Sequence, residues 1–476
     1  MSNLSPLVKN TEYAVRGEIA ILAEALQEQL ENGTKLPFNE ITNINIGDPQ
    51  LLKQKPISFF RQVSSLIENP DLLLDKNLEQ VKILYPRDVI DRARKLLKSV
   101  GGNIGSYSHS MGIPYIRKQV AKFIEERDGY PSDPERIFLT AGASPAVQMI
   151  LQCMVNKPDV GVMIPIPQYP LYTASLALFN SRAVPYYLNE QKGWSMDTTD
   201  LKEAIDRARK QGTDVRALVV INPGNPTGQC LSDSNMREII DFCHRERLVL
   251  CADEVYQTNS YSKNLPFHSF KKILRSMGPT YDNFELFSFH SISKGVIGEC
   301  GRRGGYVECV GIDPEIIRQM YTLSSMCVAN VQGQIMVELM VNPPSPGEPS
   351  YDLYMEETKE IHQSLVRRSV KLYEAFNDLE GVTCSKAEGA MYLFPRIRLP
   401  AKALKAAQKA GKQPDVYYCL DMLKATGICV VPGSGFGQKD GTWHFRATFL
   451  APEHTFDEFI NLLKSFHKKF MEEHQD

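Results

Sequence analysis

The sequence lacks the features by which several classes of protein are recognised. Its 476 residues contain no apolar run close to the roughly 20 residues that a membrane-spanning helix needs. Lys and Arg number 54 against 56 Asp and Glu, and the net charge of −2 gives no basic excess for binding nucleic acid. The sequence also has no internal repeat and no low-complexity tract. We therefore expect neither a membrane nor a nucleic acid among its partners.

The ten cysteines show no pairing pattern and no C-x-x-C motif. Several stand in apolar stretches, as Cys251 does in LVLCA (248–252), where cysteine is usually a small core residue. In a chain of this size the pattern indicates reduced thiols rather than disulfides, and we predict no metal site. The first 17 residues lack the apolar core of a signal peptide and the Arg-rich length of a transit peptide. The expected compartment is the cytoplasm, or the mitochondrion if a presequence has been removed.

The composition is ordinary for a folded protein of about two or three domains. Hydrophobic residues make up 43% of the chain and charged residues 23%, which is enough apolar material for a large core. The proline-rich segment NPPSPGEPS (342–350) is the best candidate for a domain boundary. We predict an N-terminal arm with part of a small domain (1–80), a large domain (81–342) and the rest of the small domain (343–476).

Apolar runs alternate with amphipathic patterns between about residues 100 and 342. The runs typical of strands buried on both faces are 160–165, 183–188, 216–221, 248–252 and 284–289. Helical periodicity lies between them, for example at Met236, Ile239, Ile240 and Cys243. This alternation predicts an α/β fold with a mostly parallel sheet covered by helices. Helices over 354–377 and 455–470, with short α+β segments between them, are predicted for the smaller domain.

Polar residues at the ends of these strands are the candidates for a binding site, because open α/β sheets bind ligands there. The segment TAGASPA (140–146) predicts a turn into a helix, with Ser144 as N-cap and Pro145 at the first helical position. Free N–H groups at such a helix start suit a phosphate. In isolation, however, most helix starts of this type bind nothing.

Three further strand ends carry polar side chains. The turn NPGNPTG (222–228) makes an asparagine available to a ligand. Asp253 follows the next strand, where it could hold a protonated ring nitrogen or simply cap the next segment. Lys294 could bond an aldehyde, and Arg303, nine residues later, could clamp a phosphate. Together the four signals indicate a ligand with a phosphate, a ring nitrogen and an aldehyde, which is pyridoxal 5'-phosphate.

The order GAS(P), NPGNPTG, ADEVY, SxSK and GxRxG resembles the fold-type-I pyridoxal-phosphate aminotransferases. Within that family, YAVRG (13–17), IPIPQYPLY (164–172), EGAMYLFPR (388–396) and GICVVPGSGFGQ (427–438) look like the alanine aminotransferases. The resemblance implies a large domain with a seven-stranded type of sheet, a smaller α+β domain made from both chain ends, and a homodimer.

The resemblance also implies roles for residues around the cofactor ring. Lys294 matches the lysine that binds the cofactor and moves the substrate proton, and we expect its buried, cation-rich site to lower its pKa. Asp253 matches the carboxylate that keeps the ring nitrogen protonated. Tyr169 matches the aromatic residue stacked on the ring, with a plain core tyrosine as the alternative. Asn225 and Tyr256 match the pair that hydrogen-bonds the ring oxygen.

Other residues match those that hold the phosphate and the substrate. The phosphate residues would be Ala143, Ser144, Ser291, Arg303 and, from the neighbouring subunit, Tyr107. Relatives with the arginine eight residues after the lysine would use Arg302, but the GxRxG frame selects Arg303. Arg446 matches the arginine that grips the substrate α-carboxylate, with Asn225 and Gly47 beside it. Arg16 is either a contact for a distal carboxylate or a surface arginine.

The activity implied by the resemblance is transfer of the amino group from alanine to 2-oxoglutarate, giving pyruvate and glutamate in two half-reactions. The substrates would thus be small amino acids and 2-oxo acids. A glutamate:glyoxylate aminotransferase is the alternative within the family. A non-catalytic cofactor-binding regulator and a structural dimer without activity are alternatives from other classes. The presence of Lys294, Asp253 and Arg446 argues against the last of these.

Overall fold

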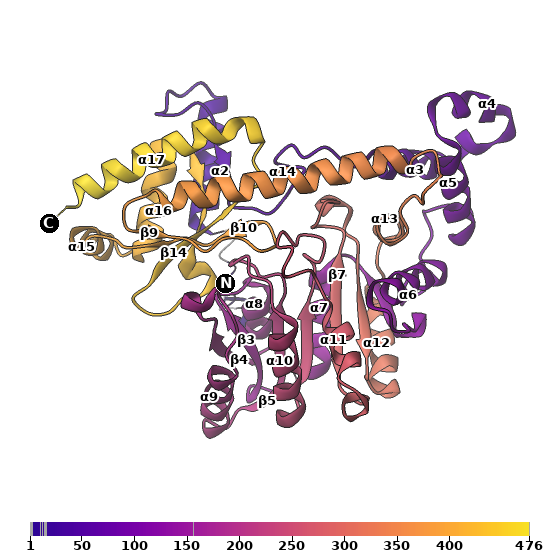
Figure 1. Cartoon of the computed structure of the whole chain (residues 1–476), viewed down its shortest axis with the longest axis horizontal. Helices are drawn as coiled ribbons and strands as arrows, with labels where there is room; N and C mark the ends of the chain where they lie inside the picture. Colours follow the sequence, from indigo (N-terminus) through magenta and orange to yellow (C-terminus); the bar gives the residue numbers. More distant parts are fainter. Residues whose placement is uncertain (1–2, 10, 12, 14–16, 156, 476) are drawn as a thin grey trace.

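The computed structural model describes residues 3–9, 11, 13, 17–155 and 157–475. Its largest sheet has seven strands in the order β2-β8-β7-β6-β5-β3-β4 (Figure 1). Their bounds are β2 Ile137–Thr140, β3 Val160–Ile166, β4 Arg182–Tyr187, β5 Asp214–Ile221, β6 Val249–Asp253, β7 Leu286–Ser291 and β8 Gly305–Val310. Strands β3 to β7 pair in parallel, whereas β8 runs antiparallel to both β2 and β7. The predicted α/β class with a mostly parallel sheet is confirmed, and each predicted strand lies within two residues of an observed one.

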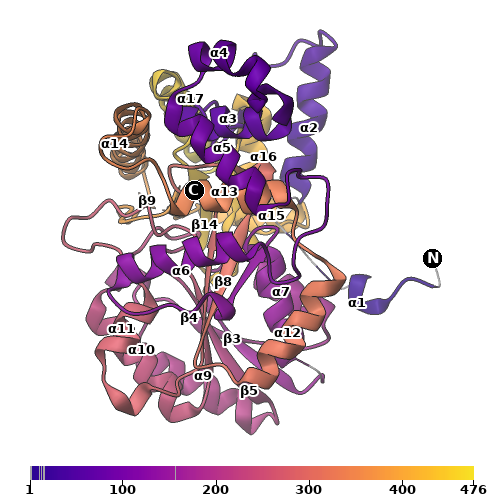
Figure 2. The same ribbon diagram turned by 90° about the vertical axis from the view of Figure 1, so that its right-hand side faces the viewer.

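Helices cover both faces of this sheet, as Figure 2 shows. Successive strand residues point to opposite faces, so each buried strand supplies two cores. On β5, Leu218 and Val220 pack into the core with α9, α10 and α11, while Val219 and Ile221 pack with α7, α8 and α12. The bounds are α6 Pro114–Asp128, α7 Ala143–Met154, α8 Leu171–Leu178, α9 Thr198–Lys210, α10 Asp233–Glu246, α11 Phe270–Ser276, α12 Pro314–Met326 and α13 Val331–Val341.

A smaller α+β part lies beyond one end of the strands of the large sheet and is built from both ends of the chain (Figure 1). One core joins α2 to α14, α16 and α17, and β1 pairs in parallel with β12. The bounds are α2 Glu18–Glu31, β1 Thr42–Asn43, α14 Tyr351–Asn377, β9 Val382–Thr383, β10 Tyr392–Leu393, β11 Arg396–Ile397, α15 Ala401–Lys409, α16 Pro414–Thr426, β12 Ile428–Cys429, β13 Val431–Pro432, β14 Trp443–Thr448 and α17 Phe456–Glu473. The two helices predicted here, over 354–377 and 455–470, are α14 and α17.

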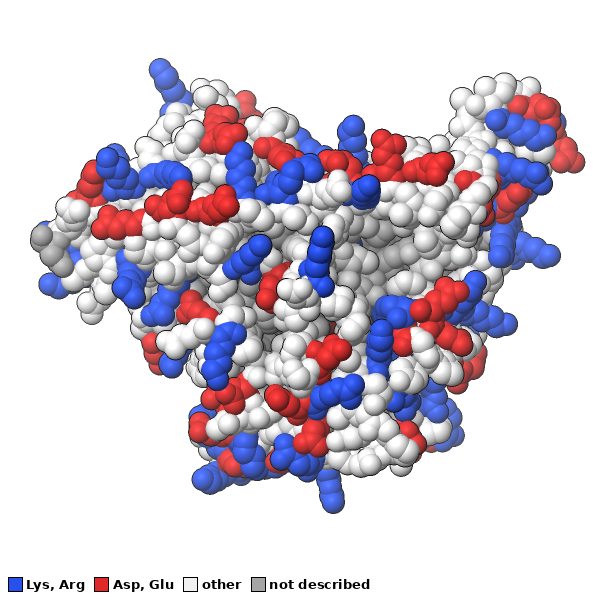
Figure 3. Space-filling view, in the orientation of Figure 1, with Lys and Arg blue, Asp and Glu red and all other residues white. Residues whose placement is uncertain are grey.

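The remaining helices are α1 Pro6–Lys9, α3 Ser58–Glu68, α4 Asp75–Leu84 and α5 Arg87–Ser99. Helices α3 and α5 pack with α6 and α13 in a third core, and α4 projects from the body of the molecule (Figure 1). Acidic and basic side chains are interspersed over the face shown in Figure 3. Among the described residues, no helix combines the length and the apolar character needed to cross a membrane. All ten cysteines are free thiols.

Candidate active site

A cavity of about 440 Å³ lies beyond the carboxyl ends of β5, β6 and β7, where the large sheet meets the smaller part. The predicted site residues that line it are Gly47, Ala143, Ser144, Tyr169, Asn225, Asp253, Tyr256, Ser291, Lys294, Arg303 and Arg446. Tyr107 is not among the lining residues, and its side chain is 96% exposed. Arg16 lies outside the described residues. The fold therefore brings together residues that are up to 400 positions apart in the sequence, such as Gly47 and Arg446.

Asp253 is a buried carboxylate with one free oxygen. It ends β6, and the Tyr172 hydroxyl donates a hydrogen bond of 2.8 Å to its Oδ2. Its Oδ1 has no hydrogen-bond partner among the described residues. Burial raises the pKa of Asp253 to about 6, although Tyr172, the Val255 N–H and Lys294 act in the opposite direction. A buried carboxylate oxygen without a partner is costly, so this site suits a ligand that offers a cationic N–H group.

Lys294 follows β7, and its Nζ donates a hydrogen bond to the Gly47 carbonyl. Burial acts to lower the pKa of Lys294, but the Tyr392 hydroxyl and the Cys300 thiol outweigh it, and its pKa lies above the ordinary value. The sequence-based expectation of a lowered pKa is therefore wrong for the ligand-free site. Burial and the Arg446 guanidinium do act to lower the pKa of Lys294, but the acidic hydroxyl and thiol groups around this amine have the larger effect.

The start of α7 and Arg303 form a cationic end of the cavity. Helix α7 has Gly142 as its N-cap with φ +98°, so Ser144 lies within the first turn and the prediction that it caps the helix is wrong. The Arg303 guanidinium donates hydrogen bonds to the carbonyls of Ala141 (3.1 Å) and Cys300 (2.9 Å). A Cβ on residue 142 would lie 2.5 Å from Arg303 Nη2, so only glycine allows this approach. Free helix N–H groups beside a guanidinium suit a phosphate.

Two serines complete this end of the cavity. The Ser291 hydroxyl lies 3.0 Å from both Ser293 Oγ and the Gly304 carbonyl. Ser293 also lines the cavity, although the sequence analysis did not single it out. Arg302 ends a short 3-10 turn (Cys300–Arg302) and is not a lining residue, whereas Arg303 is.

Arg446 lies at the opposite end of the cavity. It comes from β14 and is only 1% exposed. Its Nη1 donates to Asn225 Oδ1 at 3.0 Å, and its Nη2 donates to the Asn45 carbonyl. The guanidinium carbon lies 4.2 Å from the ring centre of Tyr392 and 4.7 Å from that of Phe436. A buried guanidinium held in one plane is well suited to bind a carboxylate by two parallel hydrogen bonds.

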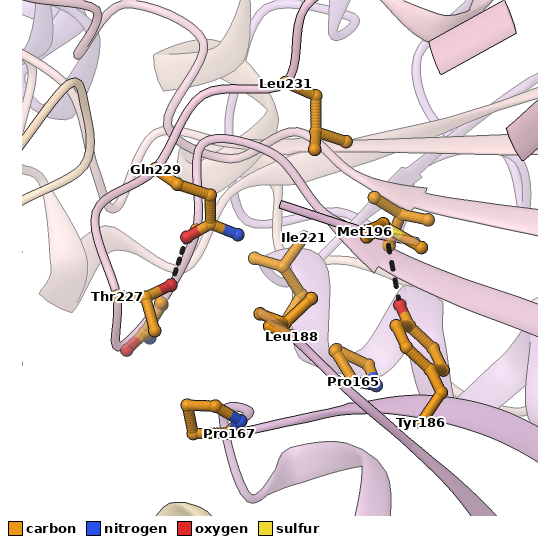
Figure 4. A pocket seen from close by; sticks show the side chains of 12 residues that line it. Pro165, Pro167, Tyr186, Leu188, Met196, Ile221, Thr227, Gln229 and Leu231 are labelled. Atoms are coloured by element: carbon orange, nitrogen blue, oxygen red, sulfur yellow. Dashed lines mark hydrogen bonds between the residues drawn. The ribbon is translucent and has the colours of Figure 1, made fainter. Parts of the chain in front are cut away.

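The turn that carries Asn225 borders a second, small cavity. Figure 4 shows Pro165, Pro167 and Ile221 around a small cavity under the turn, with a hydrogen bond from Thr227 to Gln229 at its side. On the other side of the turn, the amide of Asn225 contacts both Arg446 and Tyr256.

Several tyrosines surround the cavity, and the strand-end argument missed two of them. The hydroxyls of Tyr169 and Tyr13 are hydrogen-bonded to each other, with ring centres 6.1 Å apart. The Tyr256 hydroxyl accepts from Asn225 Nδ2 at 3.4 Å and donates to the Tyr392 hydroxyl at 3.2 Å. Tyr13 and Tyr392 come from the N-terminal arm and from β10, neither of which ends a strand of the large sheet. Their only sequence signals are the motifs YAVRG and EGAMYLFPR.

Comparisons with known proteins agree with this geometry. The family described as "Aminotransferase class I and II" matches residues 77–464. The chain is 52% identical to a probable mitochondrial alanine aminotransferase of Dictyostelium discoideum, over 100% of this chain and 90% of that protein. It is 49% identical to glutamate–glyoxylate aminotransferase 2 of Arabidopsis thaliana, over 100% and 97%. The structure of alanine aminotransferase from Pyrococcus furiosus has the same fold, with a TM-score of 0.76, 23% identity and coverage of 98% and 100%.

Proposed function

The chain belongs to the class I and II aminotransferase family and is an aminotransferase, and on this premise we propose that it transfers the amino group of L-alanine to 2-oxoglutarate. The products are pyruvate and L-glutamate, formed in two successive half-reactions. The observation that carries the proposal is the single cavity that holds Lys294, the free oxygen of Asp253 and the guanidinium of Arg446. The names of relatives about 50% identical over the whole chain support alanine as the amino donor.

The cofactor we propose is pyridoxal 5'-phosphate, and the residues present fit it. The free oxygen of Asp253 would hold the ring nitrogen, and Tyr256 with Asn225 would hold the ring oxygen. Lys294 would bond its aldehyde. The phosphate would be held by the start of α7 (Ala143 and Ser144) with Ser291 and Arg303, while Tyr169 would lie against the ring. When bound, the cofactor supplies an electron-withdrawing ring that acidifies the proton on the substrate Cα.

The chain's own residues would then position the substrate and move its proton. Arg446 and Asn225 would bind the α-carboxylate, and the backbone at Gly47 would lie close to it. Once the substrate amine has displaced it from the cofactor, Lys294 Nζ would take the proton from Cα as a general base and deliver it, as a general acid, to the cofactor carbon that had carried the aldehyde. The Asp253 carboxylate would keep a proton on the ring nitrogen by charge pairing in a buried site. Burial of these groups would keep water away from the reacting atoms.

A glutamate:glyoxylate aminotransferase is the alternative function, favoured by relatives of that name at 49% identity. The two functions would use the same residues described above and differ in the preferred amino donor and acceptor. The test is to measure kcat/KM for a panel of 2-oxo acids, once with alanine and once with glutamate as the donor. The proposal expects kcat/KM with alanine to be highest for 2-oxoglutarate, and a higher value for glyoxylate with glutamate as donor would favour the alternative.

We propose that the working unit is a homodimer in which Tyr107 reaches the phosphate bound by the neighbouring subunit. The exposure of this side chain, 96%, supports a role outside its own subunit.

The domain division proposed is 1–80, 81–342 and 343–476. The core that α2 shares with α14 and α17 supports a small domain drawn from both chain ends.

The compartment we propose is the cytoplasm, with the mitochondrion as the alternative. Ten free thiols support a reducing compartment, which fits either one. Two relatives are named as mitochondrial, which supports the mitochondrion as the alternative. Cell fractionation with an antibody against the native protein would decide between the two.

A further inference from the structure

Tyr392 lies against the carboxylate-binding arginine through the pairing of two strands. In the antiparallel pair β10–β14, Tyr392 is opposite Thr448, so Arg446 is its diagonal neighbour on the same face. Figure 1 shows β10 beside β14 in the smaller part. The Arg446 guanidinium is held between the rings of Tyr392, at 4.2 Å, and Phe436, at 4.7 Å. Two aromatic faces restrict the guanidinium to one plane and compensate part of its lost hydration.

The hydroxyl of Tyr392 reaches the other end of the site. A Cβ on Gly47 would lie 1.9 Å from Tyr392 Oη and 3.2 Å from Lys294 Nζ, so these two atoms lie within about 5 Å of each other. The absence of a side chain at Gly47 is what leaves room for the hydroxyl. Tyr256 donates a hydrogen bond to this hydroxyl at 3.2 Å. Tyr392 therefore acts as the acceptor in that bond.

Charged and titratable groups that act in both directions on its pKa surround Tyr392. They are Lys294, Arg446, Tyr256, Cys300 and Tyr13. Burial alone raises the pKa of a phenol, yet Lys294 and Arg446 outweigh this and the pKa of Tyr392 is lowered. The same interaction raises the pKa of Lys294. Tyr392 and Lys294 thus stabilise each other's charged forms at the wall of the cavity.

We propose that Tyr392 is a positioning residue that couples the two ends of the site: its ring holds the plane of Arg446, and its hydroxyl sets the protonation of Lys294. The proposal rests on the proposed function, because it assigns Tyr392 to the same reaction. The two roles reside in different atoms and can be separated. A tyrosine that only fills the core would have neither effect.

Tyr392→Phe removes the hydroxyl and keeps the ring. The visible absorption of the holoenzyme changes with pH, and we expect the midpoint of this change to fall by at least about half a pH unit. The reason is that the variant loses a group that stabilises the protonated nitrogen of Lys294. The pH profile of kcat/KM should move in the same direction. Binding of propionate, a carboxylate without an amino group, should stay within about twofold. The matched control is Tyr418→Phe, since Tyr418 is equally buried and hydrogen-bonds to His467 at 2.9 Å, away from the cavity.

Tyr392→Leu removes the ring as well and should weaken propionate binding about tenfold or more, with a rise in KM for alanine and glutamate alike. Phe436→Leu should weaken propionate binding in the same direction without moving the absorption midpoint. If Tyr392→Leu fails to fold, the nearly isosteric Tyr392→Phe still tests the hydroxyl.

The proposal is overturned if Tyr392→Phe moves neither the midpoint nor the pH profile, or if Tyr392→Leu binds propionate as the wild type does. Absence of alanine turnover in the wild type would instead refute the proposed function, since spectral titration and propionate binding need no turnover.

Discussion

Arg446 Nη1 donates a hydrogen bond of 3.0 Å to Asn225 Oδ1, and this bond joins β14 of the smaller part to the turn after β5. Asn225 in turn contacts Tyr256 through its Nδ2. One amide therefore links the group proposed to bind the substrate carboxylate with the group proposed to bind the cofactor ring.

Replacing Arg446 by lysine tests the carboxylate assignment. An ammonium group offers a point charge in place of two parallel hydrogen bonds, and losing a charge-assisted bond costs about 1.5–3 kcal/mol. We expect kcat/KM to fall by about one to two decades for alanine, glutamate, pyruvate and 2-oxoglutarate alike. Cofactor affinity should barely change. A loss confined to the dicarboxylic substrates would move Arg446 to the distal carboxylate.

Asp253→Asn should retain the cofactor but slow removal of the Cα proton by several orders of magnitude. The amide cannot pair with a protonated ring nitrogen, so the ring withdraws electrons less strongly. The measurement is the rate of the spectral change after alanine is mixed with the enzyme. Tyr172→Phe is a useful companion, because it removes only the hydrogen bond to Oδ2 and should have a much smaller effect. An unchanged rate in Asp253→Asn would make the residue structural.

The raised pKa of Asp253 also predicts how the cofactor-free protein responds to pH. The folded carboxyl has a pKa of about 6 against an ordinary value of 3.8, so between these values the folded chain keeps a proton that the unfolded chain releases. Stability should therefore fall as pH rises from about 4 to 6. In Asp253→Asn this part of the decline should disappear. Urea unfolding midpoints of both proteins at four pH values test it, and parallel curves would contradict it.

Hybrid dimers test whether Tyr107 acts across the subunit interface. In a dimer of one Lys294→Ala subunit and one Tyr107→Ala subunit, one site carries both changes and the other carries neither. We expect purified hybrids, isolated with two different affinity tags, to show close to half of the wild-type activity. If Tyr107 acted within its own subunit, every site in the hybrid would carry one change and activity would stay low.

Site residues near the ends of the large sheet's strands could be predicted from the sequence, whereas those from other parts of the fold could not. Asp253 ends a buried strand, and Lys294 and Asn225 lie within four residues of the ends of two others, so local pattern and the geometry of parallel sheets were enough to group them. Tyr392 and Tyr13 reach the cavity from other parts of the fold through contacts between distant segments, which no local pattern specifies. The error at Ser144 has a similar origin, because the approach of Arg303 to Gly142 is a tertiary contact. The raised pKa of Lys294 has the same origin, because Tyr392, which raises it, reaches Lys294 through a tertiary contact.

The central claim is that Lys294 carries out amino transfer from alanine in this cavity, and rapid mixing of the holoenzyme with L-alanine tests it most directly. The wild type should lose its visible absorption band and release one pyruvate per subunit, and 2-oxoglutarate should restore the band. Lys294→Ala should bind the cofactor through its phosphate yet show neither change, whereas the surface control Lys405→Ala should behave as the wild type. A wild-type spectrum that does not respond to alanine, or a Lys294→Ala variant that reacts at the wild-type rate, would contradict the account.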